Sequence, residues 1–211
     1  MSKTVYEKEL KTRFWESKKP KPVVKCTEII KNSGWVLSNV FSEEECKAFI
    51  AMGNKIGYNS LKGEYSESYR NNTRFMLSSP SLAKEIYQRI EQFIPEKLYN
   101  KWSKDGLNDY FRFCKYEKNG IFGIHQDGSY RPSHNYQSFL TCMLYLNRTD
   151  GGNTRFFSDK KKSETIIELP PEPGQILLFN PDIWHDGDKV LSGEKYIIRT
   201  EVMFKKNQKT P

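Results

Sequence analysis

Two histidines and one aspartate have the residue types and the spacing of a metal site. His125 and Asp127 lie two residues apart in the segment HQD, and His185 follows 58 residues after Asp127. On a β-strand, side chains at positions i and i+2 point to the same face, so this imidazole and this carboxylate can reach one ion. Two histidines and one carboxylate occupy one face of an octahedron in non-haem iron sites and leave three positions open for other ligands. A histidine on a strand is more often an ordinary hydrogen-bonded group, so the triplet needs support from the rest of the chain.

A lysine ten residues after the second of these histidines gives such support. Lys195 begins the segment KYIIRTEVMF, whose alternation predicts a strand with Lys195 and Arg199 on one face. A lysine that faces the interior of a barrel is costly unless it is paired, because burial disfavours its charged form. A dicarboxylate ligand would supply the partner. The alternative is a lysine whose stem lies along a half-open strand while its ammonium stays in water.

Hydroxyl groups on neighbouring strands are further candidates for this pocket. Tyr116 ends the segment YFRFCKY, Tyr145 lies in TCMLYLN, and Thr154 follows a Gly-Gly turn. Each hydroxyl can donate a hydrogen bond to a buried carboxylate. The alternative for both tyrosines is a place in the aromatic core.

Two polar segments are candidates for substrate contacts, because such contacts usually come from loops around a site. GEYSESYRNNTRF contains Arg70 and Asn72, and GSYRPSHNYQ contains Tyr130. These side chains can bind a peptide backbone or a carboxylate. The alternative is that they are ordinary polar loop residues.

Two helices are predicted in the first half of the chain. Ser42 with Glu45 three residues later forms a capping-box signature. The second helix is expected over 79–102, with Ser79 as its cap and Pro80 in its first turn. The apolar residues of the second helix fall on one face and are expected to belong to the core.

Period-two alternation of apolar residues predicts strands in most of the remaining chain. The expected strands are 35–40, 110–117, 122–127, 138–147, 153–157, 164–169, 175–180 and 195–204. Many short strands after two helices indicate a mainly β (α+β) fold, a double-sheet barrel or jelly roll with supporting N-terminal helices.

The length of 211 residues suits one domain with a real core. We expect an N-terminal flank at 1–32 and a single domain at 33–205, followed by a tail at 206–211. Within the domain, helical support is expected at 41–102 and the jelly-roll core at 109–204.

Composition narrows the class of protein. Aromatic residues make up 14% of the chain, which argues against disorder. We see no apolar run of the roughly 20 residues that span a bilayer, and no secretory signal at the N-terminus. The net charge of +8 comes from scattered lysines and is expected to be a solvated surface, so a nucleic-acid partner is not favoured. The four cysteines lie far apart and are typical of reduced thiols, so we expect an intracellular protein in the cytoplasm, with the nucleus as the alternative. A monomer is compatible with these features.

Five segments in order resemble the prolyl 4-hydroxylase-like branch of the Fe(II)/2-oxoglutarate-dependent dioxygenases. They are FCKYEKNGIFGIHQDGS, FLTCMLYLN, GGNTRFF, PEPGQILLF and HDGDKVLSGEKYIIRTEVMF, and they extend over nearly half the chain. The resemblance implies a double-stranded β-helix with helices packed on one sheet.

The resemblance also implies roles for individual residues. It assigns Fe(II) to His125, Asp127 and His185, and the distal carboxylate of 2-oxoglutarate to Lys195 with Tyr145. Tyr116, Thr154 and Arg199 are expected to line the same pocket.

The implied reaction couples oxidative decarboxylation of 2-oxoglutarate to succinate with hydroxylation of a C–H bond. The expected substrate is a prolyl residue in a protein or peptide, with O2 as cosubstrate and L-ascorbate as reductant. Two alternatives stay open: a hydroxylase of a free amino acid or other small molecule, and a non-enzymatic, cupin-like metal-binding module. The inward-facing Lys195 favours the enzyme, because a module that only binds a metal has no need for a lysine that holds 2-oxoglutarate.

Overall fold

The computed structural model describes residues 4–6 and 23–207, which form two α-helices, two facing sheets and a small two-stranded sheet of β11 and β16. The helices are α1 (Glu43–Ile56) and α2 (Pro80–Ile90), and a 3₁₀ turn η2 (Glu91–Phe93) follows α2. The strands up to the middle of the chain are β1 (Thr4–Tyr6), β2 (Lys25–Ile30), β3 (Gly34–Ser38), β4 (Asn59–Ser60), β5 (Thr73–Ser78), β6 (Lys97–Leu98), β7 (Trp102–Leu107), β8 (Tyr110–Tyr116) and β9 (Phe122–His125). The remaining strands are β10 (Tyr136–Tyr145), β11 (Asp150–Gly151), β12 (Thr154–Phe157), β13 (Thr165–Leu169), β14 (Ile176–Phe179), β15 (Trp184–Gly187), β16 (Val190–Ser192) and β17 (Lys195–Lys206).

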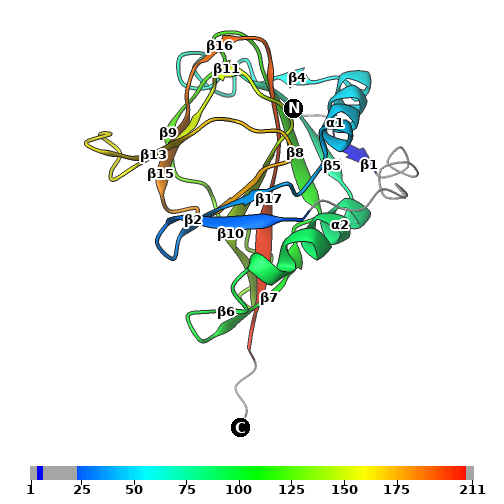
Figure 1. Cartoon of the computed structure of the whole chain (residues 1–211), viewed down its shortest axis with the longest axis vertical. Coiled ribbons are helices and arrows are strands. Elements are labelled where there is room, and N and C mark those ends of the chain that lie inside the picture. Colours follow the sequence, from blue (N-terminus) through cyan, green and yellow to red (C-terminus); the bar gives the residue numbers. More distant parts are fainter. Residues whose placement is uncertain (1–3, 7–22, 208–211) are drawn as a thin grey trace.

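The larger sheet has the order β1-β5-β8-β17-β10-β14-β3-β2, and β17 is long enough to pair with β8 along its first half and with β7 along its second. The smaller sheet has the order β13-β12-β15-β9. In Figure 1, α1 and α2 lie on one side of the strands, whereas β9, β13 and β15 lie on the opposite side. This arrangement is a double-stranded β-helix with helical support, which confirms the expected fold class.

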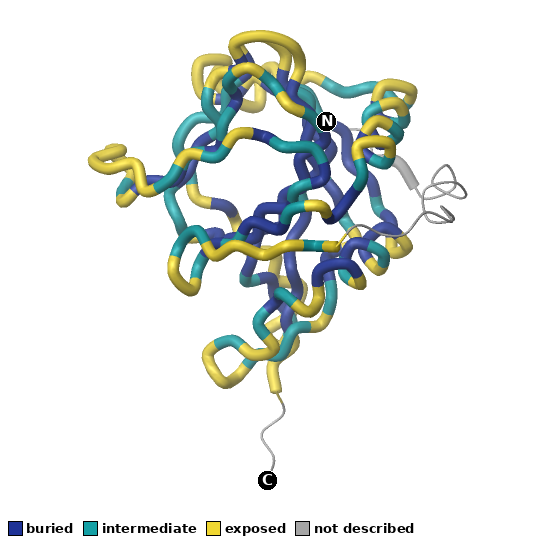
Figure 2. Tube along the Cα trace, in the orientation of Figure 1, coloured by how far each residue is buried: buried dark blue, intermediate teal, exposed yellow. Residues whose placement is uncertain are grey.

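Both faces of the central strands of the larger sheet are buried, and period-two alternation divides their side chains between two cores. On β10, Cys142 and Leu144 point into the helix-side core, whereas Met143 and Tyr145 point into the core between the sheets. Figure 2 shows the result as a buried centre of strands beneath exposed loops.

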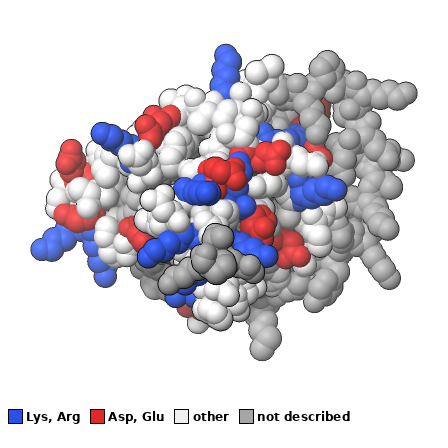
Figure 3. Space-filling model, turned by 90° about the horizontal axis from the view of Figure 1, so that it is seen from below, with Lys and Arg blue, Asp and Glu red and all other residues white. Residues whose placement is uncertain are grey.

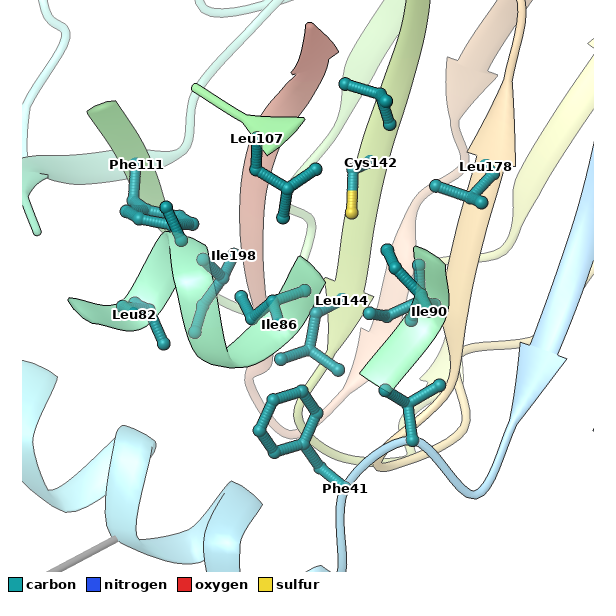
Figure 4. Close-up of a cluster of buried hydrophobic side chains, with 14 of the residues drawn as sticks. Phe41, Leu82, Ile86, Ile90, Leu107, Phe111, Cys142, Leu144, Leu178 and Ile198 are labelled. Atoms are coloured by element: carbon teal, nitrogen blue, oxygen red, sulfur yellow. The ribbon is translucent and has the colours of Figure 1, made fainter. Parts of the chain in front are cut away.

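The helix-side core fixes α2 on the sheet. Its apolar stripe of Leu82, Ile86 and Ile90 is at most 1% exposed, and Figure 4 shows these side chains facing Leu144 and Leu178 from the sheet. Burying each such side chain stabilises the fold by about 1.5–3 kcal/mol.

The start of α1 follows the capping-box prediction. The Ser42 hydroxyl accepts from the Glu45 backbone N–H at 3.2 Å, and the Glu45 carboxylate accepts from the Ser42 N–H at 2.8 Å. The same carboxylate pairs with Arg89 of α2 at 2.7 Å, and Arg89 also donates to the carbonyl of Val40 at 2.9 Å. This network joins the two helices to the connection between β3 and α1.

The second helix is shorter than the predicted range 79–102. Helical structure ends at Phe93, because Pro95 has no backbone N–H to continue it. Strands β6 and β7 follow as a hairpin, and its turn residues Tyr99 and Asn100 have positive φ angles of 52° and 53°.

Further strands lie where none was predicted, among them β2 and β5. Strand β2 pairs with β3, so part of the expected flank 1–32 belongs to the sheet, while residues 7–22 lie outside the described residues. Strand β5 pairs with β8.

On the face in Figure 3, basic and acidic side chains are intermixed rather than gathered by sign. No helix within residues 4–6 and 23–207 has the length and apolar character needed to cross a bilayer.

Candidate active site

Sheet pairing brings the two histidines together. Strands β9 and β15 are antiparallel neighbours in the smaller sheet, and His185 lies directly opposite His125. Their ring centroids are 4.2 Å apart. Asp127 follows β9, and its carboxylate oxygens lie 3.6 Å from Nε2 of His125 and 3.7 Å from Nε2 of His185. One potential ligand atom from each residue lies within 4.8 Å of the others.

Backbone carbonyls fix how both imidazole rings are protonated. Nδ1 of His125 lies 2.8 Å from the carbonyl oxygen of Gly123, and Nδ1 of His185 lies 2.8 Å from that of Ile183. Because a carbonyl oxygen only accepts, each Nδ1 carries the proton and each Nε2 keeps its lone pair for the shared centre. Metal-binding histidines are oriented by such partners.

Asp127 is held as an anion. Thr141 donates to one carboxylate oxygen at 2.7 Å, and Arg199 forms an ion pair with the other. Burial alone would raise the pKa of Asp127, but the positive charge of the Arg199 guanidinium beside it holds that pKa well below its usual range.

His185 is held neutral at pH 7, because burial lowers its pKa to about 4. A metal needs a deprotonated carboxylate and neutral imidazoles. The donor set of His125, Asp127 and His185 therefore fits a divalent metal of the non-haem iron type.

Lys195 lies at the start of β17, beside the same cavity. Its side chain is 4% exposed, and its ammonium donates to the carbonyl of Gly152 at 2.5 Å. Among the described residues, Lys195 forms no ion pair with a carboxylate, and burial lowers its pKa to about 8. The Tyr145 hydroxyl donates a hydrogen bond to the Thr154 hydroxyl at 2.7 Å, and Nζ of Lys195 lies 5.5 Å from the centre of the Tyr145 ring. A buried cation with hydroxyl donors nearby fits a carboxylate ligand.

One cavity connects these two features. It is lined by Arg70, Arg112, Cys114, Tyr116, Phe122, His125, Asp127, Met143, Thr154, Phe179, His185, Asp186, Gly187, Lys195, Ile197 and Arg199. The structure therefore brings together most of the side chains that the sequence singled out.

The three candidate substrate residues are placed differently. Arg70 lines the cavity, and Asn72 is buried beside it and accepts a hydrogen bond from Arg70 Nε at 2.7 Å. Tyr130 is 47% exposed and lines a separate groove with Tyr87 of α2 and Met203 of β17.

Comparison with known proteins identifies the family. Residues 111–200 match the sequence model of the 2OG-Fe(II) oxygenase superfamily, and this segment contains the whole metal triad and Lys195. These residues belong to the 2OG-Fe(II) oxygenase superfamily. Together with the triad, the match makes the chain a 2-oxoglutarate-dependent dioxygenase, as the sequence motifs predicted.

Solved structures share the fold of this oxygenase at low identity. The viral collagen prolyl hydroxylase vCPH from Paramecium Bursaria Chlorella virus-1 is 19% identical, with a TM-score of 0.58 over 84% of this chain and 99% of that one. A Pseudomonas putida prolyl-4-hydroxylase is 15% identical, with a TM-score of 0.57 over 83% of this chain and 93% of that one. A Trichoplax adhaerens prolyl hydroxylase, in complex with a hypoxia inducible factor peptide, is 13% identical, with a TM-score of 0.60 over 82% of this chain and 84% of that one. Comparison with curated protein sequences gives no significant match.

Sequence reasoning missed two residues that support the site of the oxygenase. Phe122 stacks on the His125 ring with centroids 3.6 Å apart, and Thr141 bonds to Asp127. Thr141 lies four residues before Tyr145 on β10, so period-two alternation places both on the inner face. That signal was sufficient to find Thr141. Phe122 lies three residues from His125 and shows no such signal.

Proposed function

We propose that this oxygenase hydroxylates a prolyl residue in a protein or peptide. Support for the prolyl substrate comes from the three similar structures, each described as a prolyl hydroxylase. The observation that carries the proposal is the single cavity that holds both the His-Asp-His triad and the buried Lys195 ammonium. A cupin-like binding module would have no use for that ammonium.

The triad would hold Fe(II) through Nε2 of His125, Nε2 of His185 and the Asp127 carboxylate. When bound, the iron and 2-oxoglutarate supply the oxidation with O2 that yields succinate, carbon dioxide and a hydroxylated C–H bond. The residues of the chain supply orientation and exclude water, and Thr141 and Arg199 fix the carboxylate that the metal requires.

The opposite end of the cavity would bind the distal carboxylate of 2-oxoglutarate. The Lys195 ammonium would provide the ion pair, and the Thr154 hydroxyl would donate a hydrogen bond. The Tyr145 hydroxyl donates to Thr154 at 2.7 Å and would orient it toward the carboxylate. Tyr116 is buried beside Lys195, whose ammonium lies 5.7 Å from the Tyr116 ring centre, and would line the same end. Such an anchor fixes where the other end of the keto acid lies, which is a positioning effect.

The test is a substrate screen read by mass spectrometry for the gain of one oxygen atom. Proline-containing peptides, whole lysate and free amino acids are incubated with Fe(II), 2-oxoglutarate, O2 and ascorbate as the proposed reductant. We expect a prolyl residue to gain oxygen while succinate accumulates. Oxygen found only on another residue type or on a free amino acid contradicts the prolyl assignment.

Variants of the triad test the ligand assignment separately. His125→Ala and Asp127→Ala should abolish both succinate formation and oxygen gain, because each removes one of three metal ligands. His134→Ala is the matched control, since this histidine is exposed on a loop and should leave turnover unchanged. Unchanged turnover in the two triad variants contradicts the metal site.

A further inference from the structure

Arg70 is a buried cation in the wall of the active-site cavity. It is 8% exposed and lines the cavity together with the triad. Its Nε donates to the Asn72 side-chain oxygen at 2.7 Å, and its guanidinium carbon lies 4.0 Å above the Phe122 ring. Tyr65 covers it from another direction, with its ring centre 5.1 Å away.

The position of Arg70 is linked to the metal triad through Phe122. One face of that ring contacts the guanidinium, and the ring also stacks on His125 with an interplanar angle of 18°. Arg70 is therefore held one aromatic ring away from a metal ligand. Its charge reaches the cavity: burial raises the pKa of Tyr116, and the charges of Arg70 and Arg199 oppose that rise.

Within residues 4–6 and 23–207, Arg70 differs from Arg112 and Arg199 because no carboxylate pairs with it. Arg112 pairs with Glu201 at 2.6 Å, and Arg199 pairs with Asp127. Lys195 is assigned to the cosubstrate. Arg70 forms no ion pair with any carboxylate in the described part of the chain, and Asn72 offers it only a neutral oxygen.

A buried, unpaired charge is costly, so such a group is usually matched by a ligand. The charges brought by Fe(II) and by 2-oxoglutarate cancel each other, so loading the site leaves Arg70 uncompensated. A planar guanidinium held on an aromatic ring is suited to a carboxylate, which it can bind through two parallel hydrogen bonds.

We propose that Arg70 binds a carboxylate of the substrate, so that the oxygenase selects an anionic substrate. The inference rests on the proposed function, since it places this carboxylate close to the prolyl ring that is oxidised. Two sources share this chemistry: an acidic side chain next to the prolyl residue, and the carboxylate of a C-terminal prolyl residue.

The experiment uses two pairs of peptides that differ in one charge. In the first pair, the residue beside proline is Asp or Asn; in the second, a C-terminal proline is a free acid or an amide. Oxygen gain gives kcat/KM for each peptide, and the charged-to-neutral ratio is independent of how much enzyme is folded. We expect the charged peptide to have a kcat/KM about 10–100 times that of the neutral peptide in one of the two pairs. This is the fold-change that corresponds to one charge-assisted hydrogen bond.

Variants then assign the preference to Arg70. Arg70→Gln should reduce the ratio to near one, and Arg70→Lys should restore part of it. Arg74→Gln is the matched control: Arg74 pairs with Glu64 at 3.1 Å and does not line the cavity, so the ratio should persist. Ratios near one in both pairs, or a preference that survives in Arg70→Gln, overturn the inference.

Peptide binding measured with Mn(II) and 2-oxoglutarate in the absence of O2 separates this inference from the prolyl proposal. Hydroxylation without charge discrimination refutes only the role of Arg70. Arg70-dependent binding of the charged peptides without hydroxylation refutes only the prolyl assignment and supports the anion site. Equal binding of charged and neutral peptides in the native chain counts against Arg70.

Discussion

Burial of Lys195 creates a site for an anion, and it also lowers the free energy of unfolding of the protein. The folded pKa is about 8 because burial disfavours the ammonium, whereas an unfolded lysine keeps its proton to about pH 10.4. Between these values the unfolded chain binds more protons, so stability rises with pH. The cost is fully present below pH 8 and disappears as the pH rises toward 10.4.

Lys195→Met should therefore stabilise the metal-free and cosubstrate-free protein at pH 7, by about 1–3 kcal/mol after loss of the bond to Gly152. Denaturant unfolding at pH 7 and pH 10 measures the difference, which should shrink at the higher pH. Lys115→Met is the control, because hydrogen bonding to Glu194 raises the pKa of Lys115 and no gain is expected. A Lys195→Met protein that is less stable at pH 7 would refute this account.

Two threonines on the inner face should separate metal binding from cosubstrate binding. Thr141 donates to Asp127, whereas Thr154 bonds to Tyr145 near Lys195. Thr141→Val should raise the metal requirement about 10–100-fold, since it removes the partner of a metal ligand. Thr154→Val should raise mainly the 2-oxoglutarate requirement. Turnover assays in which Fe(II) or 2-oxoglutarate is titrated measure the two requirements of each variant. If both variants changed the two requirements equally, the assignment of Thr141 to the metal and of Thr154 to the cosubstrate would be contradicted.

At the scale of elements, the turn before β14 ties three segments together. Gly174 donates to the carbonyl of Tyr145 at 3.0 Å, and its own carbonyl accepts from the backbone of Val40 at 2.9 Å and of Phe41 at 3.2 Å. Its φ is +76°, and a Cβ there would lie 1.9 Å from the carbonyl oxygen of Phe41. The turn therefore requires glycine for its conformation and for the close approach of another backbone.

Gly174→Ala should lower the free energy of unfolding by more than about 3 kcal/mol, because backbone strain and a steric clash add. Gly193→Ala is the matched control, since its φ is +77° and nothing lies within 4 Å of the added Cβ. That variant should lose only about 1–2 kcal/mol, the conformational part. Equal losses in chemical denaturation would show that the contact with Phe41 contributes nothing.

At the scale of the whole molecule, the proposed ligands would join the two sheets. The triad histidines lie on the smaller sheet and Lys195 on the larger one. A ligand that binds only the folded state at 100 times its Kd adds about 2.7 kcal/mol. For a chain of this size, that corresponds to a rise in Tm of about 5–10 °C.

Thermal unfolding with Mn(II) and 2-oxoglutarate checks this expectation without turnover. The native protein should gain stability from the metal and further stability from the cosubstrate. His125→Ala should lose the response to metal, whereas Lys195→Met should keep that response and lose the additional rise. A rise that persists unchanged in both variants would mean that the ligands bind elsewhere.

The amino-acid sequence by itself determined the local features of this protein. Alternation specified the strands of the β-helix core, the Ser42–Glu45 pair specified the start of α1, and residue types in family-like segments identified the triad and Lys195. These signals are local, because a strand period or a helix cap depends on residues close together in the chain.

Only the tertiary structure decided which of these residues meet. The pairing of His185 with His125, the stacking of Arg70 on Phe122 and the placement of Tyr130 in a separate groove depend on strands and loops far apart in sequence. Register and partner choice arise from burying whole faces of the sheets together, which no short segment encodes. Among the described residues, Arg70 is left without a carboxylate because the tertiary structure pairs Glu201 with Arg112 and Asp127 with Arg199.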